Sequence, residues 1–250
     1  MYQDITLEIN AGVALIGLNR PEVLNAIRIA TYQELIHALG TADNNPDVSC
    51  ILIFGHGHSF CAGNDLRDLL PGTDIRALRA GVAGIFDRLA RLQKPLILAQ
   101  EGVAVGIGAN LMLHADMVIA STSARYSLPF ARIGVCSEGA CSVLLPAAIG
   151  PHRANELLMT GRNFSVEEAC QWGLVNQICT KGEALKTAHE VARQLLANSG
   201  LSIAAIRQLG RPDNYVEMIN QVVEKEMDQF EALLALEDTR SRIRALLIRP

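Results

Sequence analysis

The chain of 250 residues lacks the features that mark several classes of protein. It has no excess of positive charge for general nucleic-acid binding, because 22 Lys and Arg stand against 26 Asp and Glu and the net charge is −4. Its first residues, MYQDITLEIN, have neither the basic region nor the apolar run of a secretory signal. The longest apolar stretch, Leu96–Leu113, is interrupted by Gln100 and Glu101 and is rich in glycine, which argues against a membrane span. We therefore expect neither nucleic acid nor a membrane among its partners.

Several binding motifs are also missing. The six cysteines include no C-x-x-C pair, which favours reduced, buried thiols over disulfides or a zinc site. His56 and His58 have no third ligand at a recognisable spacing, so we expect no metal. A Walker lysine is absent, and Gly106-Ile107-Gly108 is not followed by the third glycine of a dinucleotide fingerprint. No transit peptide or C-terminal SKL is present, which favours a cytoplasmic location.

What the chain does contain indicates one large α/β domain. Hydrophobic residues make up 50% and charged residues 19%, enough for a substantial core. Apolar runs and turn residues predict a hairpin and three buried strands, at Ile5–Asn10, Val13–Leu18, Cys50–Phe54, Leu96–Gln100 and Met117–Ala120. Helical spacing predicts helices at Thr31–Leu39, with Thr31 as N-cap, and at Ile75–Leu92. Strands that alternate with helices imply parallel pairing in a sheet covered on both faces.

After about Pro129 the pattern becomes mainly helical. The predicted helices are Ala140–Ile149, Arg153–Met159, Val166–Trp172, Ala184–Ala197 and Tyr215–Leu236. The last is amphipathic, so we expect it to pack on its own domain and on a neighbouring subunit. We interpret residues 1–195 as the core and residues 196–250 as a helical region of the same domain that joins the subunit interface.

Two glycine-containing junctions carry the functional signal. Gly55–Leu66 (GHGHSFCAGNDL) and Gly102–Leu113 (GVAVGIGANLML) each follow a predicted strand and lead into helix-compatible sequence. Small residues there let a ligand approach the backbone, and the first N–H groups of a helix have no partner within it. Two such junctions side by side are suited to form an oxyanion hole, with two backbone donors directed at one oxygen.

The chain resembles the crotonase superfamily of enoyl-CoA hydratases and isomerases over nearly its whole length. The resemblance lies in LNRPEVLNA, SFCAGNDL, the long segment from KPLILAQ to DMVIAS, and GRNFSVEEACQWGLVNQI, in this order, at Leu18–Ala26, Ser59–Leu66, Lys94–Ser121 and Gly161–Ile178. It implies a crotonase-like spiral of ββα units with a helical C-terminal trimerisation region. The expected assembly is a homotrimer or a dimer of trimers.

The resemblance also implies an acyl-CoA substrate and a set of site residues. Its oxyanion hole would be formed by the backbone N–H groups of Ala62 and Ile107. The implied substrate-binding residues are Ala26, Cys61, Ala62, Gly63, Asn64, Asp65, Leu66, Gly106 and Asn110. Arg20 and Lys94 either neutralise CoA phosphates or are ordinary surface charges.

The acid–base positions depart from the hydratase pattern. Asn110 and Phe130 stand where family hydratases have two glutamates, and neither side chain serves as a proton shuttle. Glu138 instead matches the single glutamate of peroxisomal-type Δ3,Δ2-enoyl-CoA isomerases, which share the GNDL segment. The alternative interpretation of Glu138 is a first-turn carboxylate that favours a helix N-terminus.

These observations predict an isomerase that moves the double bond of an acyl-CoA, with Glu138 as the one proton carrier. The reaction requires no metal or redox cofactor, since CoA belongs to the substrate. The alternatives are a hydratase or other thioester chemistry, and a CoA-binding homologue without catalysis.

Overall fold

The main β-sheet begins with the predicted hairpin. In the computed structural model, which describes residues 2–248, β1 is antiparallel to β2, and the following strands are parallel to their neighbours. The order across the sheet is β1-β2-β3-β4-β6-β9, with bounds Ile5–Asn10, Val13–Leu18, Cys50–Gly55, Leu96–Gln100, Met117–Ser121 and Gln177–Cys179. The hairpin and the three predicted buried strands are confirmed, and β9 was not predicted.

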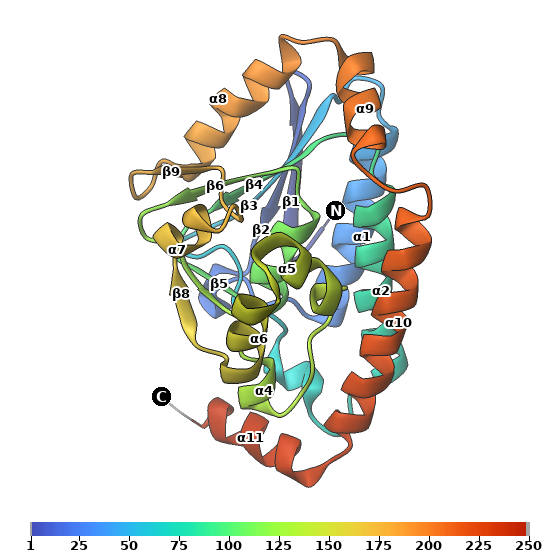
Figure 1. The fold of residues 1–250 in the computed structure, drawn as a ribbon, viewed down its shortest axis with the longest axis vertical. Helices are drawn as coiled ribbons and strands as arrows, with labels where there is room; N and C mark the ends of the chain where they lie inside the picture. Colours follow the sequence, from blue (N-terminus) through green and yellow to red (C-terminus); the bar gives the residue numbers. More distant parts are fainter. Residues whose placement is uncertain (1, 249–250) are drawn as a thin grey trace.

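The sheet is covered on both faces, as the apolar strands predicted. Ile51 of β3 points into the larger core, which contains α1 (Ile29–Asn44) and α2 (Ile75–Arg91). Its neighbour Leu52 points to the other face, which is covered by α8 (Ala184–Leu196). Figure 1 shows these helices on either side of the sheet. Successive strand residues face opposite sides, so a strand buried on both faces needs a continuous apolar run.

A second, smaller sheet was not predicted. It consists of β5 (Val103–Val105), β7 (Arg125–Ser127) and β8 (Asn163–Ser165), with β5 parallel and β8 antiparallel to β7. Three-residue strands are too short to show a periodic pattern in the sequence. This sheet extends the chain beyond the carboxyl end of β4 and positions the second glycine turn.

The remaining described elements are helical. The short ones are η1 (Pro21–Val23), η2 (Leu66–Leu69), α3 (Ile107–Asn110), η3 (Leu111–His114), α4 (Phe130–Ile133) and α7 (Val166–Gln171). The longer ones are α5 (Cys141–Ile149), α6 (Pro151–Thr160), α9 (Gly200–Leu209), α10 (Tyr215–Leu234) and α11 (Glu237–Leu247). The described helices include none long and apolar enough to cross a bilayer.

Some boundary predictions were wrong. Helix α1 begins at Ile29, so Thr31 is its third residue and not its N-cap. The Thr31 hydroxyl accepts a hydrogen bond from the Arg28 N–H at 3.3 Å and donates one to Asp4 at 2.5 Å, which stabilises the first turn from inside. The first glycine junction leads only into the 3₁₀ turn η2. Helices α9 and α11 lie in the region 196–250 that was expected to be helical, but they were not predicted individually.

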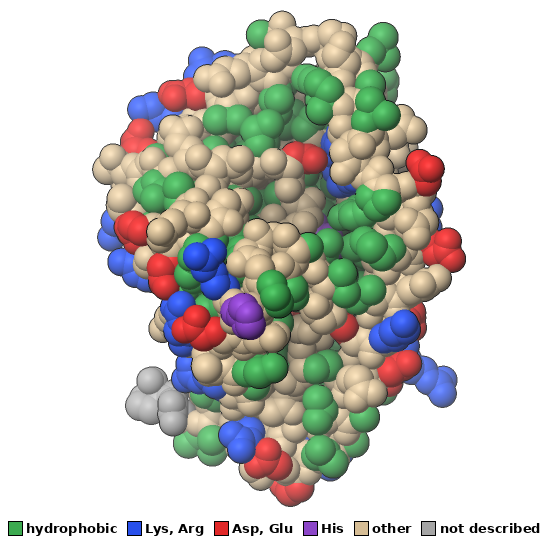
Figure 2. Space-filling view, in the orientation of Figure 1, with side chains coloured by type: hydrophobic (Ala, Val, Ile, Leu, Met, Phe, Trp, Pro, Cys, Tyr) green, Lys and Arg blue, Asp and Glu red, His purple; other side chains and the backbone are tan. Residues whose placement is uncertain are grey.

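Helix α10 buries its apolar face within its own chain. Figure 1 shows it running beside α2, and the two helices are joined by Arg79, which bonds Asp228 at 2.8 Å and Glu231 at 3.1 Å. Exposed apolar side chains of the C-terminal region include Leu201 at 86% and Leu209 at 85%, both on α9. Figure 2 shows hydrophobic side chains at the surface over α9. The packing of α10 on its own domain is confirmed, and its expected contact with a neighbouring subunit stays a prediction.

Candidate active site

The two glycine turns lie against each other. Cys61 forms a parallel bridge with Ala104, so the first turn runs beside β5. A Cβ on Gly63 would lie 2.9 Å from the carbonyl oxygen of Val105 and 3.9 Å from Cα of Gly106. Both glycines have positive φ, +96° at Gly63 and +53° at Gly106, a region that side chains disfavour. The predicted meeting of the two junctions is thus present.

The backbone donor predicted in the first turn is already occupied. The N–H of Ala62 donates to the carbonyl oxygen of Leu24 at 2.9 Å, so Ala62 is not available to bind a substrate oxygen. In the next residues Ile27 donates to Gly63 at 2.8 Å and Asp65 donates to Ile27 at 2.8 Å.

Asn64 lies between Gly63 and Asp65, whose backbone groups form hydrogen bonds with Ile27. Successive backbone groups of an extended segment point to opposite sides, so the Asn64 N–H points away from Ile27. Within residues 2–248 this N–H has no hydrogen-bond partner. The available donor in the first turn is therefore Asn64, two residues after Ala62, and the register of the bridge to Ile27 decides this.

The second turn provides the donor that was predicted. Ile107 is the first residue of α3, after Gly106, and its N–H has no partner inside the helix. Gly106 has the positive φ, so Ile107 keeps an ordinary backbone conformation and its side chain is fully buried. The isoleucine at this position is accommodated without backbone strain.

A cavity of about 160 Å³ opens beside the two turns. Its wall is apolar apart from Asn64 and Glu138, and it includes Phe130 of α4, Phe230 of α10 and Leu246 of α11. Among the described residues that line it, Glu138 is the one titratable side chain. Five of the predicted substrate residues line this cavity, namely Ala62, Gly63, Asn64, Leu66 and Gly106, whereas Ala26, Cys61, Asp65 and Asn110 do not.

Glu138 is buried and its ionisation is shifted. The side chain is 1% exposed, Oε1 accepts a hydrogen bond from Nδ2 of Asn64 at 2.8 Å, and Oε2 has no partner in the described residues. Burial raises the pKa of Glu138 to about 7, against a smaller lowering by the Asn64 hydrogen bond. A carboxyl group with a pKa near neutrality both accepts and returns a proton readily.

Glu138 is not the first-turn carboxylate of the alternative interpretation. Helix α5 begins at Cys141 with Ala140 as N-cap, so Glu138 lies in the preceding loop. Asn110 donates to the backbone carbonyl of Glu138 at 2.5 Å, and His114 lies 2.8 Å from the carbonyl of Gly139. These contacts hold the loop from α3 and η3.

The family follows from the whole chain. The family model for enoyl-CoA hydratase/isomerase matches residues 8–246. The chain belongs to this family. Among the solved structures, Pseudomonas aeruginosa OdaA has a TM-score of 0.93 and 32% identity, covering 99% of this chain and 100% of its own. An enoyl-CoA hydratase/isomerase from Pseudoalteromonas atlantica T6c has a TM-score of 0.89 and 29% identity, over 98% and 97%. The crotonase-like fold is thereby confirmed.

Relatives with assigned reactions carry different names. The 1,2-epoxyphenylacetyl-CoA isomerase of Escherichia coli K12 is 34% identical over 83% of this chain and 82% of its own length. The short-chain-enoyl-CoA hydratase of Clostridium acetobutylicum is 31% identical over 82% and 80%. The carnitinyl-CoA dehydratase of Proteus mirabilis is 35% identical over 84% and 81%. An acyl-CoA-processing enzyme is common to these names, and the reaction type differs among them.

One side chain missed by the sequence analysis supports the loop that carries Glu138. Glu226 of α10 is 7% exposed, and its carboxylate accepts from the N–H groups of Ala140 at 2.7 Å and Ser142 at 2.9 Å. It thereby satisfies the unpaired donors at the start of α5. In the sequence, Glu226 stands out as a carboxylate on the apolar face of the predicted C-terminal helix. Only the tertiary structure shows that it caps the start of α5.

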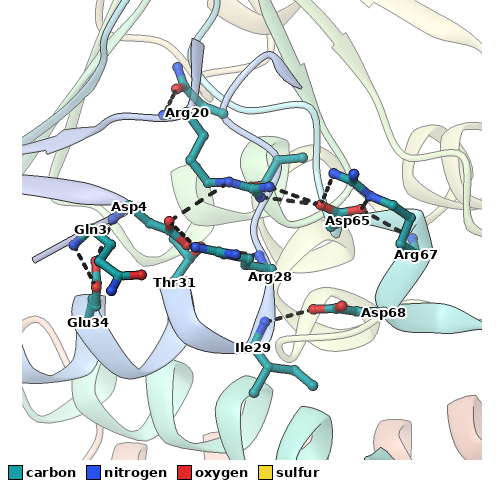
Figure 3. A network of polar contacts seen from close by, with 12 residues as sticks. Gln3, Asp4, Arg20, Arg28, Ile29, Thr31, Glu34, Asp65, Arg67 and Asp68 are labelled. Atoms are coloured by element: carbon teal, nitrogen blue, oxygen red, sulfur yellow. Dashed lines mark hydrogen bonds and ion pairs between the residues drawn. The ribbon is translucent and has the colours of Figure 1, made fainter. Parts of the chain in front are cut away.

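Arg20 has a structural partner next to the first turn. Figure 3 shows Asp65 between Arg20 and Arg67, and Arg20 also donates to the carbonyl of Ala26 at 2.6 Å. Burial raises the pKa of Asp65, but hydrogen bonds from Arg67 and Arg20 outweigh this and hold it below its usual value. Asp65 also accepts the Arg67 N–H as N-cap of η2. The Arg20–Asp65 pair thus joins the loop before η1 to the residue that follows the Asn64 donor.

Two other candidates lie outside the cavity. Lys94 precedes β4, at the opposite end of the strand from the glycine turns, and donates to the Ala42 carbonyl at 2.8 Å. It therefore serves the end of α1 and not a ligand at this site. His56 lies 3.0 Å from the Thr6 hydroxyl, and residues 2–248 contain no group of three or more His, Cys, Asp and Glu placed to hold a metal ion. All six cysteines are free thiols; Cys50, Cys61 and Cys141 are buried as expected, and the other three are only partly buried.

Proposed function

We propose that this enzyme isomerises 3-enoyl-CoA thioesters to 2-enoyl-CoA thioesters. The observation that carries the proposal is Glu138, the one titratable side chain among the described residues that line the cavity, with a pKa of about 7 and a free Oε2. Moving a double bond removes one proton and returns it at another carbon, so one such group suffices. Water addition needs a second group to activate the water.

The two turns would stabilise the charge that develops. The thioester oxygen would accept hydrogen bonds from the N–H groups of Asn64 and Ile107, both unpaired in the described structure. Removal of a C2 proton by Glu138 then forms a dienolate, and the same carboxyl group returns the proton at C4. Preorganised donors at such an oxygen typically contribute about 10²–10³ in rate each.

The positions of the two missing acids support this choice. Asn110 is buried and donates to the Glu138 carbonyl, so it is a support of the loop and not a proton carrier. Phe130 provides apolar wall. The proposed steps involve only backbone donors and one carboxyl group, and the CoA is part of the substrate.

The test compares two reactions on one preparation. Isomerisation of a 3-enoyl-CoA and hydration of a 2-enoyl-CoA are measured for the wild type and for Glu138→Gln, together with acyl-CoA affinity. We expect isomerisation to dominate and to fall about 10²–10⁴-fold in the variant, with affinity retained. Dominant hydration would overturn the isomerase assignment, and tight binding without turnover would indicate a non-catalytic CoA-binding protein.

A further inference from the structure

Three side chains from distant parts of the chain form one hydrogen-bonded row. Tyr32 on α1 donates its hydroxyl to Oδ1 of Asn64 at 2.5 Å, and Nδ2 of Asn64 donates to Oε1 of Glu138 at 2.8 Å. Tyr32 is 0% and Glu138 1% exposed. The row connects the first helix of the core to the carboxyl group that lines the cavity.

The chemistry of its ends fixes the direction of the row. An amide side chain has one acceptor end and one donor end, whereas a carboxylate only accepts. Because the Glu138 carboxylate accepts, the NH₂ group of Asn64 faces it, and the Tyr32 hydroxyl donates a hydrogen bond to the amide oxygen on the other side. Turning the amide over would place its oxygen against the carboxylate with no proton between them. The carboxylate therefore fixes the orientation of the amide, and the Tyr32 hydroxyl holds the amide by its oxygen, with Oε1 of Glu138 bonded and Oε2 free.

The tyrosine itself is tightly confined. A Cβ placed on Gly81 of α2 would lie 3.0 Å from Cβ of Tyr32 and 3.1 Å from its ring. The absence of a side chain at Gly81 therefore lets α2 pass directly over the ring. A ring held between two helices has little freedom to move its hydroxyl away from Asn64.

We propose that Tyr32 and Asn64 form a positioning pair for Glu138, which directs Oε2 at the substrate while the backbone of Asn64 binds the thioester oxygen. This rests on the proposed function of Glu138 as the base. Asn64 would then place both the substrate and the base. Its backbone N–H binds the thioester oxygen, and its side-chain amide holds Glu138. Tyr32 would act through Asn64 without touching the substrate.

Few other charges act on Glu138. Glu226 of α10 is the other carboxylate that faces it, and it favours the protonated form of Glu138. His114 lies next to the loop, but burial lowers its pKa to about 4, so it is neutral at assay pH. Burial raises the pKa of the remaining titratable neighbours, which stay protonated: Tyr32, Cys61, Cys136 and Cys141. A pH effect of the pair is therefore not masked by another titration.

The test uses Tyr32→Phe, which removes only the hydroxyl, and Tyr126→Phe as its matched control. Tyr126 is also buried, at 1% exposure, and donates to an amide oxygen, that of Gln100 at 2.9 Å, but it does not line the cavity. Asn64→Ala removes the amide and keeps the backbone N–H. Turnover, KM and the pH profile are measured on a 3-enoyl-CoA, and Glu138 is titrated directly by carboxyl ¹³C NMR.

We expect Tyr32→Phe to shift the acidic limb of the kcat/KM profile to higher pH by about one unit. The reason is that the Asn64–Glu138 hydrogen bond, which favours the carboxylate, is weakened. Turnover at neutral pH should fall about 3- to 10-fold with KM nearly unchanged, Asn64→Ala should shift the limb at least as far, and Tyr126→Phe should match the wild type. If both folded variants leave the limb and the Glu138 titration unchanged, the positioning pair is refuted. If the NMR titration shifts while turnover does not, the pair is supported and the assignment of Glu138 as base fails.

Discussion

Glu138→Gln is expected to have opposite effects on activity and on stability. The buried carboxyl group has a pKa of about 7 against an ordinary 4.5. This difference corresponds to on the order of 3 kcal/mol between its two protonation states. Glutamine keeps the shape and can still accept the Asn64 hydrogen bond, but it neither ionises nor carries a proton.

The sign of the pH effect follows from the direction of the pKa change. Because the folded pKa lies above the unfolded one, the folded state binds a proton more tightly than the unfolded chain. Its contribution to stability is complete below about pH 4.5 and is lost as the pH rises through about 7. Above that pH the wild type carries a buried charge, which Glu138→Gln does not have.

The assay is chemical unfolding at two pH values with activity measured in parallel. At pH 5 the two proteins should have similar free energies of unfolding. At pH 8.5 the variant should be more stable than the wild type by on the order of 3 kcal/mol, although it is inactive. If Glu138→Gln gained no stability over the wild type between pH 5 and pH 8.5, the description of Glu138 as a desolvated, nearly neutral acid would be refuted. Catalysis that persists within a few-fold would refute its role as base.

Further predictions concern the turns and the assembly. Ile107→Ala should keep substantial isomerase activity, because the donor is a backbone N–H, and loss of all turnover in a folded variant would contradict this. Gly63→Val should lose acyl-CoA affinity and stability, because its Cβ would lie 2.9 Å from the Val105 carbonyl oxygen. The φ of +96° alone costs a valine about 1–3 kcal/mol. Normal binding by calorimetry would show that the first turn is misassigned. Light scattering should give a trimer or a dimer of trimers, with Leu209→Glu on the exposed face of α9 weakening it, and a 27.0 kDa monomer at micromolar concentration would contradict the assembly.

The sequence alone determined the hairpin and the three central strands of the main sheet, and the residue types at the candidate site. Buried parallel strands need unbroken apolar runs, which is why Cys50–Phe54 and Leu96–Gln100 were located to within one residue. The glycines at the two turns, and the glutamate that remains where the other acids are missing, are visible as residue types. Their chemical identity does not depend on where the chain places them.

Only the tertiary structure decided which backbone groups are free. Ala62 and Asn64 are two residues apart, and nothing in their side chains shows that Leu24 occupies one N–H while the register with Ile27 leaves the other unpaired. Such bonds join segments that are far apart in sequence. Local residue patterns therefore carry no record of them.

The same reason explains the supports of the proposed base. Tyr32 and Glu226 lie 106 and 88 residues from Glu138 along the chain, and each reads in the sequence as one residue of an amphipathic helix. Their hydroxyl and carboxylate acquire a role only where α1 and α10 pack around the loop that carries Glu138. The sequence supplied the proposed base, and the packing of distant helices determined its orientation and its pKa.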